Sequence, residues 1–223
     1  NARPSIAPTF GVQPMLGTNP LTFGLPTDEE FPFFLDCATS MSQRGKIEVA
    51  ARLDREIPEG WVIGNDGNTR TDTHAILKDL TKGEAALTPL GGISEETGSH
   101  KGYGYATVVE ILSAALQGGS FLHALSGIQD GKPVPHALGH FFIAIDIESF
   151  IGLDEFKKTT GDILRELRAS KRAPGKERIY TAGEKEYLTS LERSKLGVPI
   201  GESLQKDFRA LVDELNLDYD FPF

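Results

Sequence analysis

The chain has a single cysteine, and this scarcity excludes a framework of internal disulfides. A lone thiol, Cys37, is typical of a reducing compartment, and we expect a cytoplasmic protein. No apolar run approaches the ~20 residues that a membrane-spanning helix needs. We therefore expect neither a membrane partner nor a secretory signal.

Clusters of basic residues are also lacking, and the 223 residues carry a formal net charge of −9. Because neutralising a phosphate backbone needs clustered Lys and Arg, this charge excludes nucleic acid as an expected partner. A single small anion needs only a local site and is compatible with the charge. With 39% hydrophobic and 25% charged residues, the composition is that of an ordinary globular protein.

Clear metal-binding motifs are scarce as well. No Cys-x-x-Cys occurs among the residues, and the one His-x-x-x-His spacing, His136 and His140, lies where we expect a loop and the start of a strand rather than one face of a helix. The five histidines are His74, His100, His123, His136 and His140. No Gly-x-Ser-x-Gly elbow is present either. We predict no metal site, and we expect Cys37 to be a small buried hydrophobic residue.

The most informative segment that is present is the glycine-rich stretch 98–104, which leads into an apolar helical run. The first amides of a helix lack internal partners and the helix dipole adds partial positive charge, so anions bind there. Lys101 adds a full charge and His100 adds a titratable group. The pattern predicts a site for a phosphate or carboxylate group, and the alternative is a helix start that binds nothing.

This stretch fits neither of two common nucleotide-binding motifs. It lacks the Gly-x-x-x-x-Gly-Lys-Ser/Thr frame of a phosphate-binding loop. A dinucleotide fingerprint that starts at Gly102 fails, because Thr107 occupies the place of its last glycine. The preceding residues 91–98 are polar and do not indicate a strand, so a Rossmann fold is excluded here.

Apolar runs and turn residues predict three strand regions. Leu21–Leu25 and 31–36 are separated by turn residues and predict a hairpin. The β-branched and aromatic run 140–147 is apolar on both faces, which predicts a central strand. Residues 179–180 predict a short strand.

Periodicity and capping residues predict five helices. They are expected over 42–55, 103–117, 154–172, 183–197 and 202–215. Ser42 and Asp154 are the expected N-caps of the first and third helices. The second helix is apolar nearly all round, so we expect it to be buried. Between the first two helices the sequence leaves two alternatives, which are turns of helix over 74–81 or a short strand near 86–89.

A series of short motifs runs along the chain in a fixed order. The motifs are Gly17-Thr18-Asn19-Pro20, Asp36-Cys37-Ala38-Thr39, Gly45-Lys46, Pro58-x-Gly60-Trp61, the Asp66-Gly67 turn with Asp72, residues 99–104, and Ala182-Gly183-Glu184 before a helix. In order and spacing the series resembles the malate/L-lactate dehydrogenases of the second type. That family also includes ureidoglycolate, sulfolactate and cyclic imino-acid enzymes. The resemblance covers essentially the whole chain.

The resemblance implies an oxidoreductase that uses NAD or NADP to transfer a hydride to or from a small 2-hydroxy or 2-oxo acid such as malate or lactate. It implies an α/β fold with a mainly antiparallel central sheet surrounded by helices, which is a non-Rossmann cofactor-binding fold. We expect residues 1–150 to form the cofactor-binding domain. Residues 151–223 are expected to be a C-terminal helical segment that packs on this domain or on a preceding part. A homodimer, or an assembly of dimers, is also implied.

Carried over by position, the cofactor contacts of the family fall on Asp36, Cys37, Ala38, Lys101, Gly183, Glu184 and Lys185. Lys101 at a helix start suits a diphosphate, and Asp36 at a strand end can accept hydrogen bonds from a ribose or a carboxamide. Without the family, Asp36 is interpreted as a turn residue and Gly183 as part of plain helix initiation. Ala2 stands where the family often has a polar residue, and Ala182 replaces its usual proline.

The family's general acid/base histidine and its Ser-His-Gly…Arg substrate clamp have no counterpart in these residues. In the family both precede the matching part, so we expect this chain to be a piece of a longer polypeptide. His100 is the histidine in a ligand-like context, and it is our candidate for contact with the substrate or the nicotinamide. Two alternatives stay open. One is a non-catalytic module on this scaffold that binds a nucleotide or another anion, and the other is an interface protein that uses the glycine-rich turn for packing.

Overall fold

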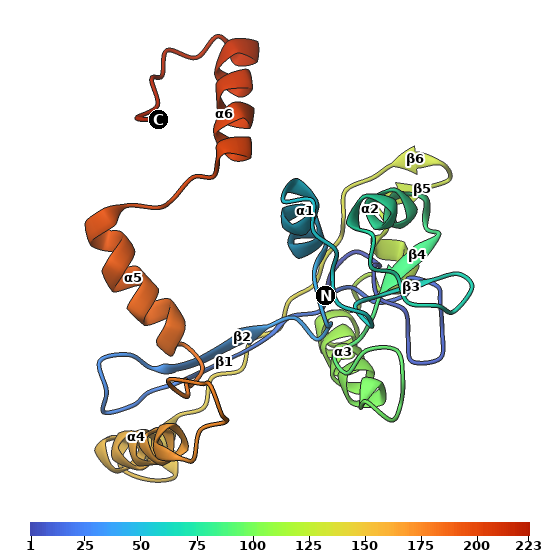
Figure 1. Cartoon of the computed structure of the whole chain (residues 1–223). Coiled ribbons are helices and arrows are strands. Elements are labelled where there is room, and N and C mark those ends of the chain that lie inside the picture. Colours follow the sequence, from blue (N-terminus) through green and yellow to red (C-terminus); the bar gives the residue numbers. More distant parts are fainter.

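The computed structural model of the protein covers residues 1–223 and combines six α-helices with three two-stranded antiparallel sheets. Figure 1 shows a compact body near the N-terminus, a long hairpin that leaves it, and three C-terminal helices at and beyond the far end of the hairpin. No helix combines the length and apolarity of a membrane span. The fold is α/β with antiparallel pairing, but the strands form three separate pairs rather than the single central sheet that we expected.

The body is built around a small antiparallel pair, β3 (Val62–Gly64) and β4 (Ala85–Leu87), whose residues are all buried. α1 (Arg44–Arg52) packs on α2 (Thr73–Lys82), and α2 packs on β4. The main core consists of Ile6, Leu16, Ile47, Ile57, Val62, Ile76, Ala85, Leu87 and Ala106. Burial of each large aliphatic side chain contributes roughly 2 kcal/mol, so this cluster holds the body together.

Both possibilities for residues 74–89 are correct, because α2 and β4 occupy different parts of this stretch. Asp72 caps α2 by accepting a hydrogen bond from the Ala75 amide at 3.0 Å. The N-cap of α1 is Gln43, without a side-chain hydrogen bond, so the predicted Ser42 cap is wrong. Ser42 is buried and its hydroxyl donates to the Gln43 carbonyl oxygen at 3.4 Å instead.

α3 (Ser99–Ala114) begins earlier than predicted, so most of the glycine-rich stretch is already helical. Ala106 and Val109 are buried at 1% and 2% exposure, whereas Tyr105 and Ile111 are 57% and 54% exposed. The expected burial on all sides is therefore wrong, because the body covers a single face of this helix.

β1 (Leu21–Leu25) and β2 (Phe33–Cys37) form the predicted hairpin, in antiparallel register from Leu21 opposite Cys37. No further strand pairs with either of them. Figure 1 shows the hairpin extending from the body to the C-terminal helices. The hairpin is therefore not part of a larger sheet.

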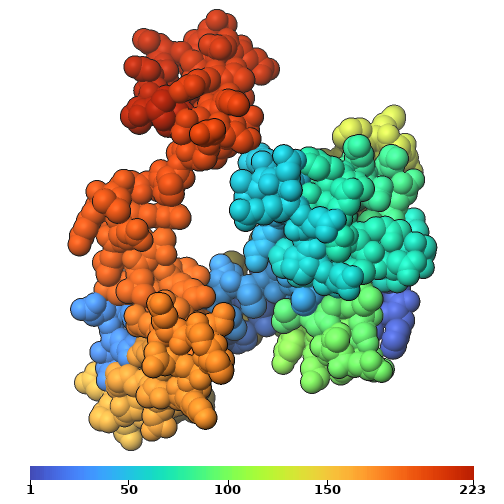
Figure 2. Space-filling view, in the orientation of Figure 1, coloured from blue at the N-terminus to red at the C-terminus, as the bar shows by residue number.

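The C-terminal helices are α4 (Leu153–Ala169), α5 (Glu184–Leu196) and α6 (Glu202–Leu215). The bounds of α5 and α6 confirm the prediction. α4 begins after Gly152, so Asp154 lies in its first turn and the predicted Asp154 cap is wrong. α4 and the start of α5 contact the tip of the hairpin. Figure 2 shows α6 and the final residues as a lobe beside the body, and Arg52 of α1 lies 4.0 Å from Asp207 of α6.

Residues 140–147 pair with no other segment, so the predicted central strand is wrong. Their side chains lie open, with Phe142 at 92% and Ile143 at 74% exposure. β-branched and aromatic residues favour an extended backbone, but a strand also needs the amides and carbonyls of a partner. The same correction applies to the short strand predicted at 179–180.

Candidate functional site

The N-terminus of α3 has no side-chain cap. Gly98 adopts the left-handed conformation, with φ 88°, that leads the chain into the helix. His100 and Lys101 are exposed, and the His100 amide donates to no backbone acceptor. The buried Ser99 hydroxyl lies 2.9 Å from that of Thr9, which anchors the turn on the N-terminal segment. This turn therefore offers a lysine, a histidine and an amide donor to an anion.

Asp36, Cys37 and Ala38 lie at the end of β2. The Asp36 carboxylate accepts a hydrogen bond of 2.8 Å from the Thr22 hydroxyl across the hairpin. Asp36 is exposed, and its carboxylate has further acceptor positions for a ligand. Cys37 is exposed too, so the expected buried thiol is wrong. β1 is the only strand beside β2, and no further strand covers this end of the hairpin.

Backbone contacts bring this strand end and the start of α3 into one region. The Leu90 amide donates to the Thr39 carbonyl oxygen at 2.9 Å. The same Leu90 backbone lies against Gly102, where a Cβ would collide with it. Gly102 is therefore required by close packing, and the structure joins the predicted contacts Ala38 and Lys101 through Leu90.

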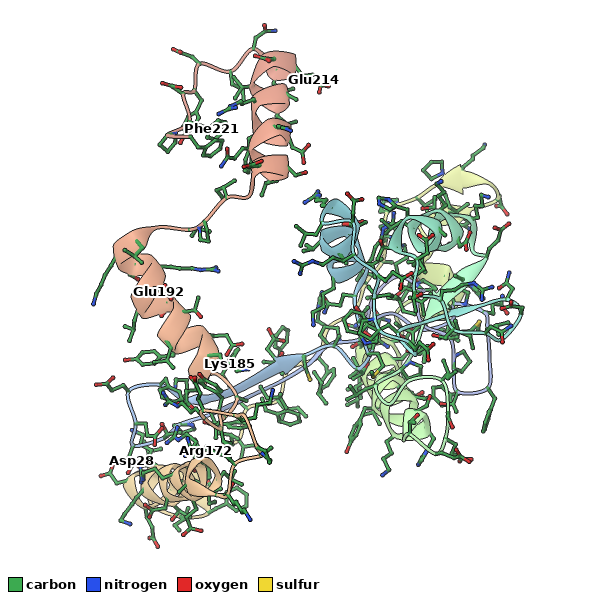
Figure 3. The ribbon with its side chains drawn as sticks, in the orientation of Figure 1. Asp28, Arg172, Lys185, Glu192, Glu214 and Phe221 are labelled. Atoms are coloured by element: carbon green, nitrogen blue, oxygen red, sulfur yellow. The ribbon has the colours of Figure 1, made fainter.

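The turn before α5, residues 181–185, lies beside the middle of β2. The Phe34 amide donates to the Ala182 carbonyl oxygen at 3.2 Å, and Gly183, with φ 89°, faces the Phe34 backbone. Figure 3 shows Lys185 at this junction of hairpin and helix. The Lys185 amide has no backbone acceptor and is available to a ligand.

Glu184 is the buried residue of this turn, with its side chain 1% exposed. It accepts a hydrogen bond from the Thr181 amide at 3.1 Å, pairs with Arg178, and lies 3.6 Å from Arg168 of α4. Burial raises the pKa of Glu184, but the hydrogen bond from Thr181 and the two arginine charges outweigh burial and hold this pKa below its ordinary value. The ionised carboxylate is thus engaged inside the protein.

Two cations flank Tyr180 beside the same turn. Lys185 Nζ lies 4.9 Å and Arg178 Cζ lies 5.3 Å from the ring centroid. A ring face attracts a cation while the other side of the cation stays hydrated. Arg178 shares its charge with Glu184, whereas Lys185 has no carboxylate partner within ion-pair distance. Lys185 is therefore the cation that this turn offers to a ligand.

A buried polar cluster in the middle of α3 was missed by sequence reasoning. Glu110 is 5% exposed and accepts hydrogen bonds from the Asn19 side chain at 2.8 Å, the Leu122 amide at 2.9 Å and the Asn1 side chain at 3.3 Å. Asn19 is fully buried, and its Oδ1 has no hydrogen-bond partner. The available signal was a lone acidic residue in an otherwise apolar helix, since a buried carboxylate needs donors.

A cavity of about 540 Å³ opens beside this cluster. Its wall is mostly apolar, and the Glu110 carboxylate is its one charged group. The lining residues are Pro8, Met15, Leu16, Tyr103, Thr107, Glu110, Ile111, Ala114, Ala115, Gly118, Gly119, Phe121 and Leu122. Tyr103 follows Lys101 by two residues, so the cavity begins close to the α3 turn.

Three other histidines have partners outside the α3 turn, and His123 Nε2 lies 3.4 Å from the Gln13 side-chain nitrogen. His74 Nε2 lies 3.1 Å from the Asp54 carboxylate on the surface, and His136 Nδ1 lies 3.0 Å from the Leu125 carbonyl oxygen. His100 is the one histidine in the glycine-rich turn itself. No group of three His, Cys, Asp or Glu side chains is placed to hold a metal ion.

The predicted contacts fit an extended anionic ligand with hydrogen-bonding groups at both ends. One set of donors surrounds Lys101 and the other belongs to the turn at Gly183 and Lys185. The stretch of hairpin from Phe34 to Ala38 that separates them rises about 13 Å. A dinucleotide has this form, with a diphosphate between two nucleosides.

Comparisons with known sequences identify the family of this chain. The pattern of the malate/L-lactate dehydrogenase family matches residues 1–209. Malate dehydrogenase of Pyrococcus horikoshii is 42% identical over 217 residues, which are 97% of this chain and 56% of that protein. Malate/(S)-sulfolactate dehydrogenase of Methanothermus fervidus is 30% identical over 218 residues, or 98% of this chain and 58% of that protein.

Solved structures give the same relationship. Malate dehydrogenase from Entamoeba histolytica superposes with a TM-score of 0.90 at 44% identity, over 100% of this chain and 61% of that one. Malate dehydrogenase from Pyrococcus horikoshii superposes with a TM-score of 0.78 at 37% identity, over 98% of this chain and 57% of that one. The chain belongs to the malate/L-lactate dehydrogenase family. It spans 56% to 61% of the length of these relatives.

Proposed function

We propose that the chain is the cofactor-binding part of an NAD- or NADP-dependent oxidoreductase that interconverts a small 2-hydroxy acid, such as malate or lactate, and its 2-oxo acid. The observation that carries the proposal is the family match over residues 1–209. The positions that correspond to the family's cofactor contacts include the exposed cations Lys101 and Lys185. Relatives named for malate and sulfolactate support the substrate class.

In this proposal residues 1–150 form the cofactor-binding domain, and 151–223 form a helical segment that packs on it. The contact of α4 and α5 with the tip of the hairpin supports this packing, because the hairpin belongs to residues 1–150 and the two helices belong to residues 151–223. The fold is proposed to be non-Rossmann. Antiparallel strand pairs, and a glycine-rich turn that follows no parallel strand, support this assignment.

Each contact has a stated role toward the cofactor. Lys101 and the adjacent amide at the start of α3 bind a phosphate. Asp36 accepts hydrogen bonds from a ribose or a carboxamide of the cofactor. The backbone of Cys37 and Ala38 lies alongside the same part of the cofactor. Gly183 allows close approach of the ligand, while Lys185 supplies an amide and a charge.

When bound, the nicotinamide supplies a ring that accepts or donates a hydride. Oxidation of a 2-hydroxy acid also releases the hydroxyl proton, which needs a base. His100 is the candidate in this chain to take that proton, because its ring is exposed beside Lys101. The reverse reaction returns the proton from the same group.

We also propose a homodimer or an assembly of dimers. Large apolar side chains on α3 and on 140–147 support it, including Tyr105, Ile111 and Phe142 at 57%, 54% and 92% exposure. A partner surface would remove this area from water. Sedimentation of the 24.3 kDa chain is expected to give twice that mass, and a monomer would contradict the proposal.

Turnover and cofactor binding together test the proposed function. The chain is assayed with malate, lactate and sulfolactate and with each oxidised cofactor, while the absorbance of the reduced nicotinamide is followed. Thermal unfolding is measured with each cofactor, because binding to the folded state raises the melting temperature. Turnover supports the enzyme. A rise in melting temperature without turnover supports the cofactor site and contradicts His100 as the group that takes the proton, and no rise with either cofactor contradicts the cofactor site.

A further inference from the structure

A series of charged side chains joins the hairpin tip to the turn before α5. Glu29 in the tip pairs with Arg168 of α4, and Arg168 lies 3.6 Å from the Glu184 carboxylate. These side chains are 14%, 16% and 1% exposed, so both contacts of Arg168 are shielded from water. We call Glu29, Arg168 and Glu184 the charge bridge.

We propose that Arg168 and Glu184 are positioning residues that hold the turn over 181–185 in the conformation that binds the cofactor. This inference rests on the proposed function, because it takes Gly183 and Lys185 as cofactor contacts. It gives Glu184 a role behind the contact surface, in keeping with the burial of its side chain.

Glu184 connects the charge bridge to the turn. Its Oε2 accepts hydrogen bonds from the Thr181 amide at 3.1 Å and from the Thr181 hydroxyl at 3.3 Å, which closes the turn around Gly183. A carboxylate this buried is costly unless cations balance it. Without the Arg168 charge, Glu184 keeps only Arg178, whose side chain is 51% exposed.

The charge bridge also fixes the turn relative to β2. Phe31 of the hairpin tip stacks on Tyr187 of α5 with ring centroids 5.1 Å apart, and the Arg168 guanidinium carbon lies 5.9 Å from the Phe31 ring centroid. The Tyr187 hydroxyl donates to the Glu30 carboxylate at 2.6 Å. The same hairpin carries Asp36, so the charge bridge sets the spacing between two groups of predicted cofactor contacts.

Arg165 offers a matched control on the same helix. It also pairs with the hairpin tip, at 2.9 Å from Asp28 and 3.3 Å from Glu29. Its side chain is 42% exposed and makes no ion pair with Glu184. A change at Arg165 therefore removes a pair between α4 and the hairpin without touching the turn. Figure 3 shows Asp28 beside α4, at the opposite end of this junction from Lys185.

The test compares Arg168→Gln and Arg165→Gln with the wild type in the full chain. Fluorescence titration with NADH and with NADPH gives the Kd, and hydrogen exchange without cofactor follows the Thr181 amide. We expect Arg168→Gln to raise the Kd about tenfold and to speed exchange at Thr181. Arg165→Gln is expected to change the Kd by less than about twofold. Arg168→Lys keeps the charge but loses the planar guanidinium that spans both carboxylates. Its Kd should therefore lie between those of the wild type and Arg168→Gln.

The outcomes separate the two proposals. A wild-type chain that binds neither cofactor overturns the proposed function. A wild-type chain that binds, together with an unchanged Kd in Arg168→Gln or equal changes in both glutamine variants, overturns the positioning role alone. If Arg168→Gln does not fold by circular dichroism, the comparison of Arg168→Lys with Arg165→Lys decides by the same criterion.

Discussion

At the residue scale, the proposed cofactor site depends most on the charge of Lys101, which is exposed in the first turn of α3. A hydrogen bond between a charged amine and a phosphate contributes about 1.5–3 kcal/mol. Lys101→Ala is therefore predicted to weaken NAD(P)H binding by about ten- to a hundredfold in a fluorescence titration. Lys78→Ala, which removes an exposed lysine of α2, is the control and should leave the affinity unchanged. Equal affinities of wild type and Lys101→Ala would exclude Lys101 from the site.

Replacing Glu110 is expected to lower the stability of the fold. Its carboxylate accepts hydrogen bonds from Asn19 and from the Leu122 amide inside the body. Glu110→Ala leaves these donors without an acceptor, so the free energy of unfolding should fall by about 2–3 kcal/mol. Urea denaturation measures this change. Glu96→Gln, at an exposed carboxylate just before α3, should lie within about 0.5 kcal/mol of the wild type. A similarly small change in Glu110→Ala would show that the cluster does not stabilise the fold.

At the scale of elements, the contact of the hairpin with α4 and α5 is predicted to weaken in acid. The pKa of Asp28 lies below its ordinary value because Arg165 hydrogen-bonds to it, and Glu184 keeps a lowered pKa despite burial, which acts in the opposite direction. A carboxyl whose pKa is lowered by folding stabilises the protein above its unfolded pKa, about 4. This contribution is lost as the pH falls through the folded pKa.

Urea denaturation between pH 7 and pH 3 measures this loss. Glu184→Gln should be less stable than the wild type at pH 7, and the difference should shrink as the pH falls through the lowered folded pKa of Glu184, below which this carboxyl is protonated in both states. Glu186→Gln changes an exposed glutamate two residues further on and should follow the wild type across the range. A Glu184→Gln deficit that is constant with pH would mean that the charge of Glu184 does not stabilise the junction.

Elements marked by local chemistry were predictable from the sequence. Gly183 and Gly197 flank α5, and turn residues between two apolar runs marked the hairpin of β1 and β2. Elements that depend on distant partners were not predictable. Residues 140–147 have the composition of a strand, but pairing requires another segment, and a local pattern does not contain it. The face of α3 that is buried depended likewise on the body beside it.

At the scale of the whole molecule, the candidate site draws on both ends of the chain. The proposed role of Lys101 follows from the sequence alone, because a cation in a glycine-rich helix start is a local signal. The contact of Glu184 with Arg168 was not predictable, because Arg168 is on another helix and itself pairs with Glu29 at the hairpin tip. The family resemblance supplied the positions of the contacts, while the structure supplied their connection through Leu90 and β2.

The central claim is that the start of α3 binds the diphosphate, and the turn before α5 binds a nucleoside, of one nicotinamide dinucleotide. A crystal structure of the chain with its preferred reduced cofactor tests this claim most directly. We predict density for a phosphate beside Lys101 and for a nucleoside beside Gly183, with the ligand following β2 between them. Cofactor density that touches neither turn, or crystals grown at saturating cofactor with both turns empty, would contradict it.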